Sequence, residues 1–411
     1  MRADKIGFHP PPHPNPLPEG EGKLFHTPHS VNPSFLASTF FPAAKDSAII
    51  ASWSAIDGSQ AVNDAWKSFI QSQGAILVGE RVQHFGKPAE ERRVAAQGNV
   101  LADLSDHALI RARGADTQNF LNGQLSNDLR QLDATHSQLA SWCSPKGRML
   151  VIFRLLRRGD DIFLQLPASL LEPTLKRLKM FVLRAKVTLE NADELIGFGI
   201  SGPEAEKILR DAQGFAPHKL NGCETRNEIT AIRLPGPHPR FEIVAPTAAV
   251  MKLWDSLKSK ATPVAPPVWA WLDIMAGIPS VHPETSEAFV PQMANLEIVG
   301  GVNFKKGCYP GQEIVARMQY LGKLKQRMYR AHVDGGTAPR PGDAIFAPDF
   351  PGQSAGTVVD AQPSPDSGYD LLAVIQISSA EAGELHLGSE NGPKLSLLTL
   401  PYSVFPATRV E

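Results

Sequence analysis

The sequence predicts an α+β protein that ends in a small antiparallel β-barrel. Pairs of strands are followed by helices, without the sustained βαβ alternation of a parallel sheet. After about residue 322, short alternating strands are separated by turns of Gly, Pro and Asp, a pattern typical of a small barrel. The 411 residues suffice for two or three domains with a sizeable core.

Residues 1–60 are predicted to be a disordered, Pro-rich extension. The first 42 residues contain nine of the 35 prolines and four of the 12 histidines, with no sustained apolar periodicity. A transit peptide is disfavoured because such peptides are rich in arginine, whereas Arg2 is the only arginine before Arg81. We expect instead a spurious upstream extension of the reading frame.

Residues 61–99 are expected to form an amphipathic helix and a linker. Trp66, Phe69 and Ile70 recur at helical spacing between about Val62 and Leu77, and Gly74 is placed to interrupt the pattern.

A regular succession of strands and helices begins near residue 100. Residues 108–113 predict a strand, and a helix follows the turn at 114–116. Residues 149–155 and 162–166 predict a β-hairpin, and 169–183 predict a helix with one apolar and one basic side. A Pro-rich joint at 261–268 interrupts this region, which runs from 100 to 321 and is followed by the predicted barrel at 322–411.

Composition excludes several classes of protein. Forty-one Lys and Arg against 42 Asp and Glu leave a formal charge of −1, so no global field marks a nucleic-acid or membrane-surface binder. The three cysteines form no CxxC pair, which argues against a disulfide framework or a preformed metal site and favours a reducing cytoplasm. No run of 18 apolar residues and no secretory signal are present, so we expect a soluble, cytoplasmic protein without a membrane partner.

The densest candidate for chemistry is the segment 300–317. Gly307 permits a turn that presents Cys308 just ahead of Pro310, a residue favoured in the first turn of a helix. The helix dipole and the adjacent Lys305 and Lys306 would favour the thiolate, which makes Cys308 a candidate reactive thiol. The alternative is an inert cysteine beside lysines that only solvate the loop. The cysteines Cys143 and Cys223 lack such surroundings.

Basic residues gather around this loop and in two other segments. Residues 305–330 contain seven lysines and arginines against Glu313 alone. Further clusters lie at 146–158 and 176–186, and together they could bind an anionic partner, either RNA or a polyglutamylated small molecule. The alternative is a set of solvated faces. Trp269 and Trp271 could wall a flat heterocycle or could simply pack in the core.

These residues carry a family resemblance. Residues 306–313 read KGCYPGQE, which is similar to the K-G-C-Y-x-G-Q-E signature of the YgfZ family, folate-binding relatives of the glycine-cleavage aminomethyltransferase. The segments FVPQMANL at 289–296, AGIP at 276–279 and FLNGQLSND at 120–128 support it in colinear order, from about residue 100 to the C-terminus. The resemblance implies a ring of two α+β domains around a central folate channel, followed by the barrel. It also implies a role in making or repairing iron–sulfur enzymes, and through such clients an effect on tRNA modification.

The resemblance assigns roles to particular residues. Cys308 is the family's functional centre, Trp269 matches its folate-contacting tryptophan, and His107 stands where an aromatic residue is expected. Gln292 and Asn295 are further expected contacts of tetrahydrofolate or a one-carbon derivative. The other motif-loop residues with expected roles are Lys306, Gly307, Tyr309, Gly311, Gln312, Glu313 and Arg317.

The sequence also departs from the aminomethyltransferase pattern. The strand at 147–152 lacks the catalytic aspartate, and Met275 stands where a folate-holding glutamate is expected. A thioether cannot accept the paired N–H donors of a pterin as a carboxylate does, so we expect no glycine-cleavage activity.

Three functions are consistent with these residues. An accessory factor would bind folate and use Cys308 with iron–sulfur client or assembly proteins, because a single thiolate cannot hold a cluster alone. The first alternative is a folate-dependent one-carbon transferase or demethylase. The second is direct binding of tRNA through the basic clusters, which charge reversal at Lys323, Lys325 and Arg327 should weaken.

Overall fold

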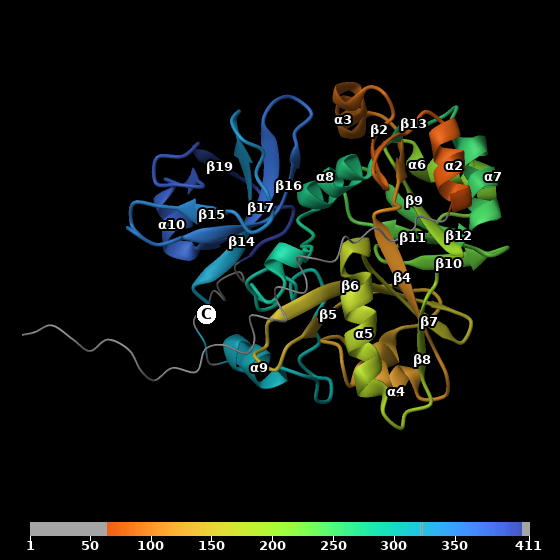
Figure 1. Ribbon diagram of the computed structural model, residues 1–411, viewed down its shortest axis with the longest axis horizontal. Helices are drawn as coiled ribbons and strands as arrows, with labels where there is room; N and C mark the ends of the chain where they lie inside the picture. The colour runs from red at the N-terminus through yellow and green to blue at the C-terminus, as the bar shows by residue number, and fades with distance from the viewer. Residues whose placement is uncertain (1–63, 321, 323, 405–411) are drawn as a thin grey trace, which may run out of the picture. The chain divides into compact units, whose positions relative to one another are not determined.

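The computed structural model describes residues 64–320, 322 and 324–404, so the extension predicted at 1–60 lies outside the described residues. It contains three larger β-sheets and a short hairpin (Figure 1). The N-terminal elements are α2 (Asp64–Ser72), β1 (Ile76–Val78), β2 (Arg81–His84) and α3 (Pro88–Gln97). The end of helix α2 agrees with the interruption predicted at Gly74. The helix ends before Gly74, whose φ of +98° disrupts it, and the chain then enters the β1–β2 hairpin.

The first sheet has six strands in the order β10-β11-β12-β9-β3-β13. All its pairs are antiparallel except β3 with β13. The strands are β3 (Val100–Asp103), β9 (Leu195–Ser201), β10 (Cys223–Arg226), β11 (Ile229–Leu234), β12 (Arg240–Pro246) and β13 (Thr262–Val264). Helices α6 (Ala205–Gln213) and α7 (Thr247–Leu257) pack on β9 and β12. Helix α2 adds to this layer, since Trp66 meets Trp254 edge to face at 5.5 Å.

Alternation along β12 divides its side chains between two faces. Phe241, Ile243 and Ala245 join the core under α2, α6 and α7. Val244 joins a different core that includes Trp269 and residues of the second sheet. Glu242 is two residues from Val244 and so lies on the same face of β12, toward the space between the two sheets.

The second sheet has five antiparallel strands in the order β5-β6-β7-β4-β8. They are β4 (His107–Arg113), β5 (Gln138–Cys143), β6 (Met149–Arg158), β7 (Asp161–Pro167) and β8 (Thr188–Asn191). The predicted hairpin is confirmed, because β6 pairs directly with β7. The helices of this region are α4 (Thr117–Asn122) and α5 (Leu171–Val182), with short 3-10 turns η1 (Leu129–Gln131) and η2 (Ala168–Leu170). Helix α5 packs on β4 and β8.

The third sheet confirms the predicted small barrel as a curled antiparallel sheet of six strands, ordered β18-β15-β16-β17-β14-β19. An isolated bridge from His386 to Lys394 brings its two ends together. The strands are β14 (Gln326–Val333), β15 (Ala344–Phe346), β16 (Gly356–Pro363), β17 (Tyr369–Gln376), β18 (His386–Leu387) and β19 (Leu395–Leu398). The other elements are α8 (Pro266–Ala276), η3 (Pro283–Thr285), α9 (Gln312–Tyr320) and α10 (Ile377–Ala382).

Helix α8 links the parts that surround the candidate site. It contacts β3 of the first sheet and β16 and β17 of the third (Figure 1). Trp271 Nε1 donates to Asp370 Oδ2 at 2.7 Å, so one of the two predicted tryptophans joins α8 to the third sheet. Within the described residues, none of the helices is long and apolar enough to cross a membrane.

Candidate functional site

A central cavity lies where β4, β6 and β7 face β12 and α8. It encloses about 830 Å³ of empty space, part of it open to solvent. Its wall includes two of the residues predicted to contact a ligand, His107 and Trp269. The polar side chains around it are Asp106, His107, Arg154, Gln165, Glu242, Asp273, His282 and Asp360. Charged groups from β4, β6, β12, β16 and α8 therefore line one space.

His107 begins β4 and is protonated at neutral pH. Burial favours the neutral ring, but the carboxylates of Asp106, Glu242 and Asp273 outweigh it and raise the pKa of His107 to about 9. Its Nδ1 lies 2.8 Å from Asp106 Oδ1, and 31% of the side chain stays exposed. His107 thus supplies a positive charge and an N–H donor at the cavity rather than only a flat ring.

Trp269 lies in the cavity wall, but its ring is packed rather than open. The side chain is 3% exposed, and the Arg240 guanidinium lies 3.9 Å from the ring centroid. A Cβ on Gly199 of β9 would lie 2.3 Å from the ring, so only glycine allows β9 to approach the indole this closely. The Arg240 guanidinium also pairs with Asp273 at 2.9 Å.

None of the four carboxylates of the cavity was identified from the sequence, and of these Glu242 is buried and Asp273 is paired with Arg240. Glu242 is buried on β12, where desolvation raises its pKa and Gln165 Nε2 donates to it. Asp273 is on α8 with 32% of its side chain exposed. Neither lies in a recognisable motif. Asp273 stands two residues before Met275 on α8, and residues two apart do not share a face of a helix, so helix periodicity gives no signal that Asp273 could replace the carboxylate missing at 275.

Gln292 and Asn295 are bound elsewhere in the fold. Gln292 Nε2 donates to the Val315 carbonyl at 2.7 Å, and Asn295 Nδ2 donates to the Met328 carbonyl at 2.8 Å. Both side chains are buried, and neither lines the central cavity. In the structure they join the 289–296 segment to α9 and β14, and the expected contact with a cofactor stays a prediction.

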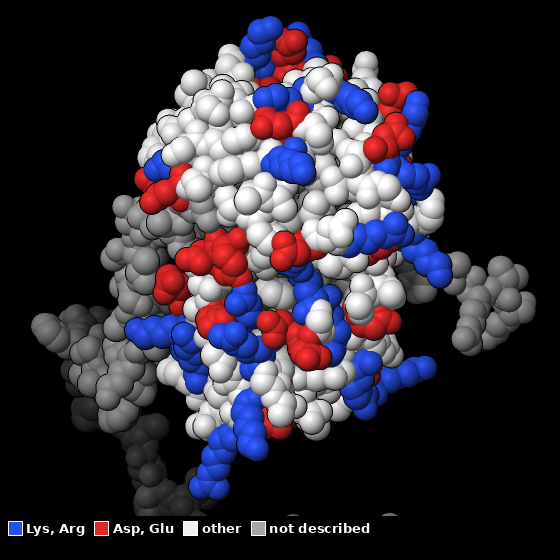
Figure 2. Space-filling view, turned by 90° about the vertical axis from the view of Figure 1, so that its right-hand side faces the viewer, with Lys and Arg blue, Asp and Glu red and all other residues white. Residues whose placement is uncertain are grey.

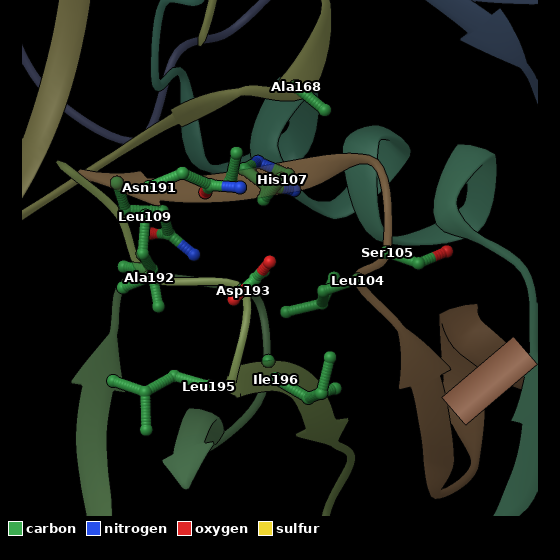
Figure 3. A pocket seen from close by; sticks show the side chains of 13 residues that line it. Leu104, Ser105, His107, Leu109, Ala168, Asn191, Ala192, Asp193, Leu195 and Ile196 are labelled. Carbon is green, nitrogen blue, oxygen red and sulfur yellow. The ribbon is translucent and has the colours of Figure 1, made fainter. Parts of the chain in front are cut away.

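A second pocket adjoins the first and shares His107 and Gln165 with it. It lies between the turn after β3 and the β8–β9 connection, and Figure 3 shows Asn191, His107 and Asp193 around the same space. Leu104, Leu109 and other apolar residues, together with Ser105, contribute to the rest of its wall.

The KGCYPGQE loop forms a separate site. Cys308 is exposed, whereas Cys143 and Cys223 are buried. Among the described residues, none from 305–313 lines either pocket. Helix α9 begins at Gln312, two residues after Pro310, so Cys308 precedes the helix by a full turn and is farther from its N-terminus than predicted.

Lys306 is not the surface cation that the sequence suggested. It is 5% exposed, and its Nζ donates to the carbonyls of Asn122 and Leu125. Burial lowers the pKa of Lys306 to about 8. Its function in the structure is to fasten the loop to the end of α4, while Lys305 remains exposed.

Glycine at 311 is required by a close contact beneath the loop. Gly311 has a φ of +77°, and a Cβ there would lie 2.4 Å from the Ser144 carbonyl oxygen. Tyr309 is buried beside it, and burial raises the pKa of its hydroxyl. Glu313 and Arg317 of α9 are exposed, and Gln312 Nε2 donates to the Lys306 carbonyl at 3.4 Å.

Some of the basic side chains counted in the sequence are buried or bound within the chain. Arg154 is buried in the cavity wall, and Arg327 donates to the Gln292 carbonyl and to Glu297. Arg327 is thus held by contacts within the chain, Lys323 lies outside the described residues, and the expected tRNA contact stays a prediction. On the face shown in Figure 2, Lys and Arg are interleaved with Asp and Glu rather than gathered in one field.

A solved structure has the same fold. The glycine-cleavage aminomethyltransferase T of Bartonella henselae matches with a TM-score of 0.68 at 17% identity, over 82% of this chain and 96% of that one. The fold class is therefore that of the aminomethyltransferases, as predicted.

Curated relatives specify the family. The tRNA-modifying protein YgfZ of Cronobacter sakazakii is 31% identical over 323 residues, covering 77% of this chain and 98% of the relative. Those of Escherichia coli O157:H7 and Colwellia psychrerythraea are 31% and 30% identical, each over 74% of this chain. No protein-family model matches the sequence. The chain belongs to the YgfZ family, which confirms the resemblance carried by its motifs.

Proposed function

We propose that this protein is a folate-binding accessory factor for iron–sulfur enzymes, through which it serves tRNA modification. The main observation that supports the proposal is the central cavity, where carboxylates and cations lie together in an aminomethyltransferase fold. The relatives' name, tRNA-modifying protein, supports the pathway.

The chemistry of the cavity fits tetrahydrofolate or a one-carbon derivative. A pterin presents adjacent N–H donors, which a carboxylate accepts well. Asp273 offers such a carboxylate, held by Arg240 and partly exposed. The imidazolium of His107 and the guanidinium of Arg154 supply positive charge for the anionic glutamate of the ligand. Bound folate would supply or accept a one-carbon group, and this chain's residues would orient and enclose it.

The thiol of Cys308 is the second part of the proposal. It is exposed at the end of a loop that Lys306 and Gly311 hold against the second sheet. An exposed thiol on an anchored loop can meet a client or assembly protein, whose own ligands would complete any cluster contact. Since none of the residues at 305–313 lines the two pockets, folate binding and thiol chemistry are separable by mutation.

Complementation tests the thiol directly. In cells lacking the protein, we expect Cys308→Ser to leave tRNA methylthiolation and other iron–sulfur activities low, while a Cys223→Ser control restores them. Equal restoration by both variants would rule out a role for the Cys308 thiol.

The cavity also favours a second candidate, a folate-dependent one-carbon transferase. The buried Glu242, whose pKa is raised, is a group that could move a proton near a bound ligand. Incubation of the protein with 5,10-methylenetetrahydrofolate and an excess of an amine or thiol that can accept the one-carbon group, followed by chromatography of the folates, distinguishes the accessory factor from the transferase. The accessory factor leaves the folate unchanged, whereas an enzyme converts it catalytically.

A further inference from the structure

The turn that follows α5 contains an unusual leucine. Leu183 has φ of 44° and ψ of −104°, and Ala185 N donates to the Val182 carbonyl at 2.8 Å. These angles resemble the first central position of a type II′ turn, where glycine is preferred because it has no Cβ. A leucine there strains the backbone. Its side chain is 89% exposed, so core packing does not explain its presence.

The surroundings of Leu183 are apolar and exposed. Met180 is 63% and Phe181 is 43% exposed. The Phe181 ring is held edge to face against Trp142 at 5.9 Å, and the turn is fastened to α4 because Lys186 N donates to Asp116 Oδ2 at 2.7 Å. Exposed apolar groups on a rigid segment are typical of interaction surfaces, where preorganised aromatic anchors contribute most to affinity.

The charges around these apolar groups have one sign. Lys176, Lys179, Arg184 and Lys186 are exposed, and their side chains make no ion pair or hydrogen bond with any described residue. The neighbouring Arg177 differs, since it lies over Trp142 and near Glu287. Four cations without an ionic partner among the described residues thus surround three apolar side chains. This pattern favours a partner that is acidic at its edge and apolar at its centre.

We propose that residues 179–186, the α5 tip, form a docking surface for an acidic, apolar segment of a partner protein. A protein segment fits better than RNA because phosphates would satisfy the cations but not Met180 and Leu183. It also fits better than a lipid surface, because a bilayer gains nothing from the fixed orientation of Phe181. The proposal is independent of folate and of Cys308.

Photocrosslinking of the full chain in its own host cells tests the proposal. Benzoylphenylalanine replaces Met180 in one protein and Leu220, an exposed leucine outside the tip, in the control. We expect position 180 to crosslink protein segments that carry Asp or Glu beside apolar residues, and position 220 not to. Equal labelling at both positions, or labelling of RNA or lipid at 180, would overturn the proposal.

Two variants separate docking from folding. Leu183→Gly should raise the melting temperature, because it relieves the strained turn, and should lower the crosslinking yield from position 180 at least about tenfold. Lys179→Glu with Lys186→Glu should lower the yield similarly, whereas Lys252→Glu on α7 should not. If Leu183→Gly lowers the melting temperature, or if the yield is insensitive to all these changes, Leu183 serves the fold and the α5 tip is not a docking surface.

Discussion

Substitution of the two glycines in the KGCYPGQE loop gives opposite expected results. At Gly311, φ is +77° and a Cβ would lie 2.4 Å from the Ser144 carbonyl oxygen and 2.6 Å from Gly147 Cα. Gly307 does not have a φ in this left-handed range, and a Cβ there would have no heavy atom within 4 Å. The same change, glycine to alanine, is therefore compared at two positions four residues apart.

The magnitude for Gly311→Ala has two parts. A left-handed conformation costs a residue with a Cβ roughly 1–2 kcal/mol, and the overlap with main-chain atoms forces the loop or the β5–β6 turn to move as well. We expect a loss of about 2–3 kcal/mol, or a fall of several degrees in melting temperature. Gly307→Ala should stay within about 0.5 kcal/mol of the parent.

Differential scanning calorimetry measures the change in melting temperature, and complementation measures the loss of function. Gly311→Ala should unfold earlier and should complement poorly, since the loop that carries Cys308 is displaced, whereas Gly307→Ala should match the parent in both. Equal losses at the two positions would show that the contact beneath Gly311 does not position the loop.

Three other predictions follow from buried or shifted groups. Lys306→Met should lower the free energy of unfolding by about 2–3 kcal/mol, because the Asn122 and Leu125 carbonyls lose a charged donor; unchanged urea denaturation would contradict the anchoring role. The folded pKa of His107 lies above its ordinary 6.5, at about 9, so its contribution is complete below pH 6.5 and is lost as the pH rises through 9. The stability difference between the parent and His107→Gln should therefore shrink between pH 7 and 10, and a difference independent of pH would refute the assignment. Burial raises the pKa of Cys143 and of Cys223 to about 11, so iodoacetamide at pH 8 should label only Cys308 in the folded protein, as mass spectrometry would show. Labelling of Cys143 would contradict this.

The sequence predicted elements whose patterns are local. The hairpin of β6 and β7 follows from two apolar runs around a turn, and the C-terminal sheet follows from repeated short strands and turn residues. The interruption predicted at Gly74 agrees with the end of α2 at Ser72, whereas the hairpin that follows was not predicted, because periodicity does not identify strands of three or four residues.

The candidate site depends on contacts between distant segments. Glu242 and Asp273 face the same cavity from β12 and α8, and nothing in either segment shows that it meets the other. The burial of Lys306 could not be predicted for the same reason, since its partners are the carbonyls of residues 122 and 125, some 180 positions away. Trp269 and His107 could be placed through the resemblance, but only the structure shows that Arg240 covers the indole.

Calorimetric titration with tetrahydrofolate tests the central claim most directly. The wild-type protein and Cys308→Ala should both bind saturably, and Asp273→Asn should bind at least about tenfold more weakly. Asparagine retains an oxygen that can accept from Arg240, and a thermal melt confirms that this variant is folded. Absence of binding by the wild-type protein, or its loss in Cys308→Ala, would contradict a folate cavity that is separate from the thiol.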